Sequence, residues 1–291
     1  MVSDAEMTTT THVAFLPESW ATDTQDAMQF AEVLSKLVNT KFESDMSIGR
    51  ILHIPHRSNL TTQTKTEGIA NTIVFEAITQ TNQDITVSTY EYSAILLNAV
   101  VEAQSGYSDR QALSNAMGYT LMRGMEVSIA ALFQSLSQIV GTLGASIDMA
   151  LLLRAWQYLA DGGFATDAAF VLSPAMASDL FSSDKLTSKD FVGVSAIENA
   201  TLPQILSFPA YTSNLLRSPA AGQREGALLH KTSTILIRQI EPTPKTSYLM
   251  RYNAEGLLMF DLYAVAEAEQ PAEAPGSESL SDTGAVLIRG A

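Results

Sequence analysis

The stretch SDRQALSNAMGYTLMRGMEVSIAALFQSLSQIV, residues 108–140, decides how this chain is organised. Its apolar side chains recur every three or four residues, which is the spacing of one face of an α-helix. Ser108 is a suitable N-cap and Gly141 follows the last residue, so the pattern predicts a helix over 108–140. Such a helix would extend about 50 Å, roughly the diameter of a compact chain of this length. We therefore expect an elongated or flattened molecule that this helix crosses.

The residues before this helix contain a long segment that cannot build a core. Residues 55–71, PHRSNLTTQTKTEGIAN, are polar and rich in threonine. A predicted strand at 48–54 precedes them, and predicted strands at 72–79 and 84–93 follow, joined by the turn-prone Thr81–Gln83. A polar excursion of this length has no core of its own, so contacts outside the subunit would have to order it.

Both ends of the chain and the region after the long helix have their own patterns. Residues 22–38 predict a helix, with an acidic and irregular segment before it. Residues 267–284 are of low complexity, and a short apolar stretch, AVLIRG, follows them. Between the long helix and this end, we predict helices at 147–160 and 174–181, strands at 169–172, 233–240, 246–252 and 256–265, and a turn at 253–256.

The composition excludes several classes of protein. Hydrophobic residues make up 46% of the 291 residues, which is ample material for a core and excludes wholesale disorder. The chain has no cysteine, so disulfide scaffolds, zinc ribbons and thiol catalysis are excluded. The net charge of −14 disfavours a protein that grips nucleic acid. Much of this charge lies in residues 1–47 and 267–291, as in acidic arms and tails.

The sequence contains no recognisable catalytic, cofactor-binding or metal-binding motif. Phosphate-binding loops, dinucleotide-binding glycine patterns and nucleophile elbows are all missing. His53 and His56 are three apart, which on a strand places them on opposite faces without an accompanying carboxylate. Glu225 and His230 beside Arg224 could form part of a catalytic triad or lie in a solvated loop. We predict no enzyme activity, no cofactor, no secretion signal and no membrane span.

The order of the parts, together with three local phrases, resembles a known family. The phrases are GRILHIP at 49–55, MRGMEVSIAALF at 122–133 and FVLSPAMASDLF at 170–181. They and the order of elements are similar to those of the major capsid proteins of tailed bacteriophages, which have the Hong Kong 97-type fold. This resemblance implies an α+β fold. Its first half would consist of an N-terminal arm at 1–47, an extended β-hairpin loop at 48–97 and a spine helix of the peripheral domain at 98–142. Its second half would consist of a mixed α/β axial domain at 143–227, peripheral strands at 228–267 and an acidic C-terminal tail at 268–291.

The resemblance also implies a function and partners. The chain is expected to be a structural, non-enzymatic subunit that forms hexamers and pentamers of an icosahedral head around double-stranded DNA. Only 47 residues precede the hairpin, which implies a separate scaffolding protein rather than an N-terminal scaffolding extension. A portal protein at one vertex is expected, and a decoration protein is left open. Assembly would take place in the host bacterial cytoplasm, with the product located in the virion and no membrane contact.

Three residues of the extended loop are candidate inter-subunit contacts, namely Arg57, Lys65 and Glu67. Some members of the family join subunits by a Lys–Asn isopeptide bond. Lys65 lies in the corresponding loop, but no matching context for the acceptor is found, so we interpret it as an ordinary interface residue. Two alternatives stay open: an encapsulin-like shell that encloses protein cargo, and an intracellular enzyme with a pocket in 143–227. A tail-fibre protein is less favoured because the chain has no internal repeat.

Overall fold

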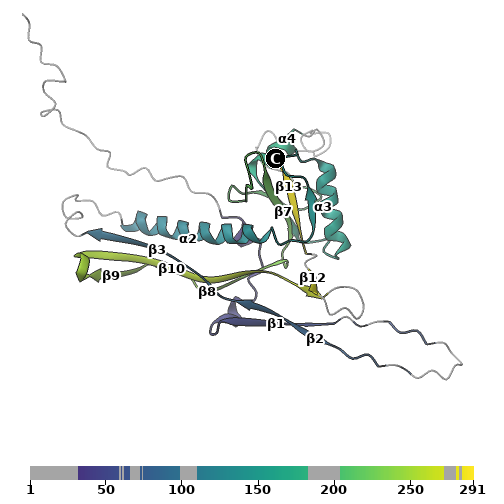
Figure 1. Cartoon of the computed structure of the whole chain (residues 1–291), viewed down its shortest axis with the longest axis horizontal. Helices are drawn as coiled ribbons and strands as arrows, with labels where there is room; N and C mark the ends of the chain where they lie inside the picture. The colour runs from purple at the N-terminus through teal and green to yellow at the C-terminus, as the bar shows by residue number, and fades with distance from the viewer. Residues whose placement is uncertain are drawn as a thin grey trace, which may run out of the picture.

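A computed structural model of the chain describes residues 32–58, 60, 62–65, 73, 75–98, 110–182, 204–271, 280–281 and 284–291. Two sheets and one long helix organise these residues into an elongated molecule with a hairpin that projects from it (Figure 1). The predicted helix over 22–38 lies largely outside the described residues. Its last part forms the short 3-10 helix η2 (Leu34–Lys36), and a second 3-10 helix, η3 (Glu43–Met46), follows.

The first sheet has five strands in the order β4-β13-β7-β5-β6. Both of its faces are covered. Helices α3 and α4 pack on one face, and the C-terminal part of α2 packs on the other. All five side chains of β5 are consequently buried, as expected for a strand that is apolar on both faces. The elements are α2 (Arg110–Leu132), β4 (Ile139–Gly141), α3 (Met149–Asp161), β5 (Ala168–Leu172), α4 (Pro174–Phe181), β6 (Ala210–Thr212), β7 (Arg224–His230) and β13 (Ala285–Gly290).

The second sheet has four strands and is covered by α2 on one face. Its central strand is β10 (Ala254–Glu267), which pairs with β3 (Thr89–Asn98) along one edge. Along the other edge β10 pairs first with β9 (Lys245–Leu249) and then with β8 (Thr234–Ile240). The alternation of β3 and β10 directs Ile95, Leu97, Leu257 and Met259 towards Met117 and Leu121 of α2. A 3-10 helix, η4 (Met250–Tyr252), and Asn253 in a left-handed conformation connect β9 to β10.

The projecting hairpin consists of β1 (Ile51–Arg57) and β2 (Gln80–Thr86), which pair antiparallel over seven residues. Apolar side chains at its root pack against β8 and β10. The described residues between the paired strands, at 58, 60, 62–65, 73 and 75–79, belong to no helix or strand. A minor pair, β11 (Gln270–Pro271) and β12 (Leu280–Ser281), lies near this root. No helix among the described residues has both the length and the apolar character needed to span a membrane.

The long helix is shorter than its periodicity predicts. It ends at Leu132, because the backbone N–H groups of residues 133–135 bond three residues back and the Ser135 hydroxyl donates to the Leu132 carbonyl at 2.7 Å. Leu136 then continues the apolar spacing as a buried loop residue, and Ile139 does so as the first residue of β4. The helix therefore spans 23 residues rather than the whole molecule.

The hairpin also differs from the prediction. Pro55 does not stop the first strand but pairs with Asn82 inside it, with its side chain exposed. The segment Thr81–Gln83, predicted as a turn, lies within β2, so the predicted strands at 72–79 and 84–93 do not form a hairpin with each other. The partner of β2 is β1, about 30 residues earlier, and β3 belongs to the second sheet.

The predicted acidic tail at 268–291 is wrong for its last residues. The apolar stretch Ala285–Gly290 is β13, whose first four side chains are fully buried between β4 and β7. The predicted boundary between residues 227 and 228 falls inside β7, which belongs wholly to the five-stranded sheet. By contrast, the predicted helices at 147–160 and 174–181 and the strands at 169–172, 233–240 and 256–265 are confirmed as α3, α4, β5, β8 and β10. The predicted strand at 246–252 is confirmed only in its first part, as β9, because residues 250–252 form η4.

Candidate interaction surfaces

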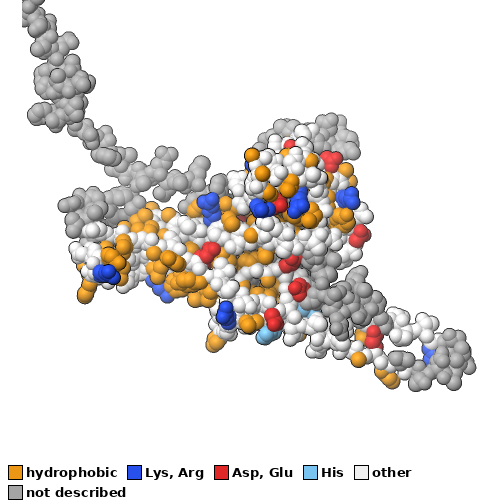
Figure 2. Space-filling view, in the orientation of Figure 1, with side chains coloured by type: hydrophobic (Ala, Val, Ile, Leu, Met, Phe, Trp, Pro, Cys, Tyr) orange, Lys and Arg blue, Asp and Glu red, His pale blue; other side chains and the backbone are white. Residues whose placement is uncertain are grey.

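One face of the four-stranded sheet is apolar. The root of the hairpin covers this face around Leu262 and Ala264, and the rest of the face, towards β9, has no cover among the described residues. Opposite α2, strand β3 presents Tyr90, Tyr92, Ala94 and Leu96, and β10 presents Gly256, Leu258, Phe260 and Leu262 beside them. Figure 2 shows hydrophobic side chains gathered over this region. We call these eight residues the open sheet face. Tyr90, Tyr92 and Leu96 are each more than half exposed, so the patch resembles an unfilled interface more than a solvated surface.

Aromatic side chains hold the inner part of the open sheet face in place. The Tyr90 ring lies 5.7 Å from the Phe260 ring and 6.2 Å from the Tyr92 ring, centroid to centroid. The Lys245 ammonium lies 4.5 Å from the Phe260 centroid, which is a cation–π contact. Rings fixed in this way offer a large apolar contact area at low entropic cost when a partner covers them.

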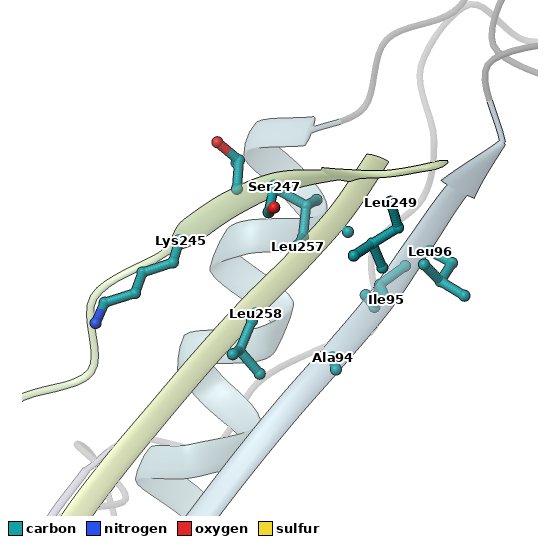
Figure 3. A pocket seen from close by; sticks show the side chains of 10 residues that line it. Ala94, Ile95, Leu96, Lys245, Ser247, Leu249, Leu257 and Leu258 are labelled. Carbon is teal, nitrogen blue, oxygen red and sulfur yellow. The ribbon is translucent and has the colours of Figure 1, made fainter. Parts of the chain in front are cut away.

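The outer end of the open sheet face is hollowed into a groove of about 730 Å³. Strands β3, β9 and β10 line it, mostly with apolar side chains. In Figure 3, Leu249 lies between β10 and β3 near Leu96, while the Lys245 side chain extends along the outer edge. The groove is open to solvent rather than enclosed, which suits an apolar polypeptide segment better than a small enclosed ligand.

The projecting hairpin carries a second set of apolar side chains without cover. Leu60, Ile73, Phe75 and Ile78 lie in the loop beyond the paired strands, and Phe75 is 90% exposed. Only a bond from Ser58 N to the Thr79 carbonyl (3.0 Å) and one from Thr79 N to the Ser58 hydroxyl (3.2 Å) continue the pairing at the loop entrance. The hairpin projects away from the two sheets (Figure 1), and these four apolar side chains are exposed.

The root of the hairpin is fixed to the rest of the molecule. The buried Gln83 amide donates to the Glu267 carbonyl at 2.5 Å and accepts from the Glu269 N–H at 3.2 Å. Around it, Ile54 and Ile85 pack against Ile237 of β8. A rigid root with an uncovered tip is the arrangement expected of a segment that reaches towards another molecule.

The first described residues are anchored by a buried carboxylate of α2. Glu126 has no exposed surface and accepts hydrogen bonds from Leu34 N (2.9 Å), Ser35 N (2.8 Å) and the Ser35 hydroxyl (2.9 Å). These N–H groups begin η2 and lack partners within it, so the carboxylate satisfies them. Asn39 then bonds to Thr234 and Leu236 of β8. The N-terminal segment is thus attached to both α2 and β8 before it continues into β1.

The structure places two of the three predicted contact residues on the hairpin. Arg57 is the last residue of β1 and Lys65 lies in the loop, and both are exposed. Glu67 lies outside the described residues. The open sheet face was not predicted. Its signal is the alternation in 89–98, where aromatic and aliphatic side chains occupy both faces of one strand, so that a single covering helix leaves half of them exposed.

The polar residues considered for catalysis or metal binding are not brought together. His53 does have an accompanying carboxylate, contrary to the prediction, because Asp84 lies opposite it on β2 with Nδ1 to Oδ1 at 2.5 Å. Glu225 is buried between Arg217 and Arg289 in a structural ion pair. Among the described residues, no group of three or more acidic or histidine side chains could hold a metal ion.

His230 is engaged away from Glu225. Its Nδ1 lies 2.8 Å from the Thr232 hydroxyl, and its ring packs 5.0 Å from the ring of Phe164, centroid to centroid. Burial lowers the pKa of His230, which the nearby Asp167 partly opposes. The pair Glu225 and His230 therefore does not form a triad, since each side chain has its own partners.

Comparison with known proteins identifies the architecture. No protein-family model and no curated protein matches the chain. Among solved structures, a chain from Mycobacterium phage Che8 matches with a TM-score of 0.77 at 20% identity, over 94% of this chain and 97% of that chain. A chain from the head of Helicobacter pylori bacteriophage KHP40 matches with a TM-score of 0.78 at 10% identity, over 99% of both. A chain from the capsid of cyanophage P-SCSP1u matches with a TM-score of 0.77 at 15% identity, over 96% of this chain and 94% of that chain.

These matches cover nearly the whole length of both partners, so the likeness includes the sheets, α2 and the projecting hairpin together. At such low identity it is a likeness of fold. The chain therefore has the fold of phage capsid subunits, which confirms at the level of architecture the family resemblance seen in its sequence.

Proposed function

We propose that the chain is a major capsid protein of a tailed bacteriophage, a structural subunit that assembles with copies of itself into a closed icosahedral head. The observation that carries the proposal is that one subunit has two exposed apolar surfaces, the open sheet face and the hairpin residues Leu60, Ile73, Phe75 and Ile78, which we call the hairpin tip. The fold shared with phage capsid chains over almost the full length supports it.

The two surfaces complement each other. The hairpin loop is an extended segment with exposed apolar side chains such as Ile73 and Phe75, and the open sheet face is an apolar strip with a groove at its end. In the assembly, the hairpin of one copy would cross the open sheet face of the next. A contact of this head-to-tail kind closes into a ring when the rotation between copies allows it, and the ring repeats each weak contact.

We propose hexamers and pentamers as these rings, with the loop residues Arg57, Lys65 and Glu67 at contacts between copies. The axial domain would comprise the five-stranded sheet with α3 and α4, and the peripheral domain the four-stranded sheet with α2. A separate scaffolding protein would guide assembly in the host cytoplasm, and a portal protein would occupy one vertex. A decoration protein could bind the completed shell.

The charge of the chain fits a container for double-stranded DNA. A net charge of −14 gives the subunit no general affinity for phosphates, so the inner wall would surround the genome without trapping it. The contact with DNA would accordingly have no sequence specificity.

The proposal is tested by expressing the full chain and measuring its assembly by sedimentation and negative-stain microscopy. Phe75→Asp places a charge on the hairpin tip, and Tyr92→Asp places one on the open sheet face. Both side chains are exposed in the subunit, so each variant should stay folded and lose closed particles. Thr120→Asp adds the same charge at an exposed position of α2 and is the matched control, which should assemble normally.

The alternatives give different outcomes. Particles that contain protein cargo and no nucleic acid when isolated from their natural source would favour an encapsulin-like shell. A small soluble oligomer whose size is unchanged by both variants would contradict the proposal and favour an enzyme.

A further inference from the structure

A polar cluster lies between α2 and the four-stranded sheet, with Asp261 and Tyr263 buried and Glu91 partly exposed. Asp261 of β10 and Glu91 of β3 are directly opposite each other and both face α2. Asp261 is only 3% exposed, and its Oδ1 atom is buried without a hydrogen-bond partner. Two residues further along β10, Tyr263 is fully buried with its hydroxyl 2.9 Å from that of Ser128 on α2. The sheet therefore places two carboxyl groups side by side beneath the helix.

The backbone of α2 passes close to this pair of carboxyl groups. Gly124 of α2 lies directly over Glu91, and a Cβ atom at that position would collide with the Glu91 carboxylate. Glycine lowers helix propensity, yet here it lets the helix backbone approach the carboxyl group closely. The same contact limits the room for water around Glu91 and Asp261.

The surroundings offer little positive charge to the pair. Arg238 on β8 is the cation that acts on Asp261, and its guanidinium also pairs with Glu43 at 3.4 Å. On α2, Glu126 is bonded to Leu34 and Ser35, and Arg123 is exposed. Burial, and after it the charge of Glu91, raises the pKa of Asp261 to about 6. Burial raises the pKa of Tyr263 to about 12, so its hydroxyl stays neutral.

We propose that the Asp261 carboxyl group, buried between α2 and the four-stranded sheet and directly opposite Glu91, holds a proton in the folded chain, and that loss of this proton to water at neutral pH loosens the joint between the helix and the sheet. With the proton bound, the Asp261 carboxyl group is neutral and its hydroxyl can act as a hydrogen-bond donor. Once the proton leaves, two negative charges face each other at the distance of a cross-strand pair, where like charges destabilise a sheet. The proposal concerns the folded subunit and does not depend on its assembly.

The sign of the pH effect follows from proton binding. Asp261 binds a proton more tightly in the folded chain than in the unfolded chain, whose aspartates have a pKa near 3.8. Stability contributed by this group is therefore full below about pH 4 and falls as the pH rises to about 6. The difference between the two pKa values corresponds to roughly 100-fold in the unfolding equilibrium constant.

The test is denaturant unfolding of the full chain at pH 5 and at pH 8, at fixed salt. Asp261→Asn mimics the protonated acid, Glu91→Gln removes the neighbouring charge, and Asp161→Asn changes an exposed aspartate as the matched control. Between the two pH values, the unfolding constant of the unmodified chain should rise about tenfold more than that of Asp261→Asn. The Asp161→Asn variant should keep the full pH dependence, and Glu91→Gln should show a reduced one.

The amide protection of α2 gives a second readout. We expect protection factors along residues 117–129 to fall from pH 5 to pH 8 in the unmodified chain and to fall less in Asp261→Asn. Equal pH dependence in the unmodified chain and Asp261→Asn would overturn the proposal. If Asp261→Asn does not fold, the Glu91→Gln variant is used for the test instead. A pH dependence of unfolding in that variant equal to that of the unmodified chain would then overturn the proposal.

Discussion

The two sheets of this molecule are both rich in apolar side chains, but they differ in how far other elements of the chain cover their faces. The five-stranded sheet has α3 and α4 on one face and the end of α2 on the other, so its strands are buried throughout. The four-stranded sheet has α2 on one face, and the hairpin root covers only part of the other, where Tyr90, Tyr92 and Leu96 are exposed. The first sheet can be stable within one chain, whereas the second leaves a face whose burial requires another molecule.

The same contrast separates the root of the hairpin from its tip. At the root, Gln83 and Ile85 are buried against β8 and β10. At the tip, Phe75 has no cover. Substitutions in the covered parts should therefore change the stability of the subunit, while substitutions in the uncovered parts should change assembly alone.

The largest effect on subunit stability is expected in the five-stranded sheet. Phe170 is fully buried beside Phe208, so Phe170→Ala should lower the free energy of unfolding by about 3–5 kcal/mol. Phe75→Ala removes the same side chain from the exposed tip and should change the free energy of unfolding by less than about 0.5 kcal/mol. Denaturant unfolding of both variants checks this, and a similar loss in both would remove the distinction between the two regions.

A smaller effect is expected at the anchor of the N-terminal segment. Glu126→Ala leaves the Leu34 and Ser35 N–H groups buried without acceptors and should cost about 2–3 kcal/mol. Glu126→Gln keeps one acceptor oxygen and should cost less. Hydrogen exchange at Leu34 and Ser35 should accelerate in the same order, and unchanged exchange in Glu126→Ala would show that the segment is held by its apolar contacts instead.

Replacing two glycines of α2 with alanine should change the free energy of unfolding in opposite directions. Gly118→Ala places a methyl group 3.7 Å from the Met259 sulfur, an ordinary contact, and should stabilise the chain by up to about 1 kcal/mol through helix propensity. Gly124→Ala meets the Glu91 carboxylate and should destabilise it by about 1–2 kcal/mol. In a Glu91→Ala background the Gly124→Ala penalty should disappear, and a penalty that persists there would point to a contact other than Glu91.

The smallest expected effect is that of ionic strength on assembly. Subunits with a net charge of −14 repel each other, so raising the ionic strength should favour assembly through screening while leaving unfolding of the single subunit nearly unchanged. Light scattering over a salt series measures the first quantity and denaturant unfolding the second. Assembly that weakens steadily with salt would show that attractive charge pairs, rather than the apolar surfaces, hold the copies together.

Local patterns predicted much of the fold. The helical spacing predicted a helix at 147–160, and the structure has α3 at Met149–Asp161, with the Asp148 side chain accepting from Leu151 N at 2.9 Å as its N-cap. The strands that lie close together in the sequence, β8, β9 and β10, were predicted within a few residues of their bounds. These elements are specified by short-range periodicity, capping and turns, which a single sequence displays directly.

Pairing between distant segments could not be predicted. Ala285–Gly290 is an apolar stretch behind an acidic one, and only its pairing with β7 and β4 shows that it is a central strand. Leu136 and Ile139 continue the helical spacing of α2, although β13 draws residues 139–141 into a sheet. The pairing of Glu91 with the buried Asp261 is likewise visible only once β3 and β10 are in register, because 170 residues separate them.

A reconstruction by electron microscopy of particles assembled from the full chain tests the central claim most directly. We predict a closed icosahedral shell in which the hairpin loop of each subunit covers the open sheet face of a neighbouring copy, with Phe75 and Tyr92 both buried. A small oligomer in place of a shell, or a shell in which the open sheet face stays exposed to solvent, would contradict the account.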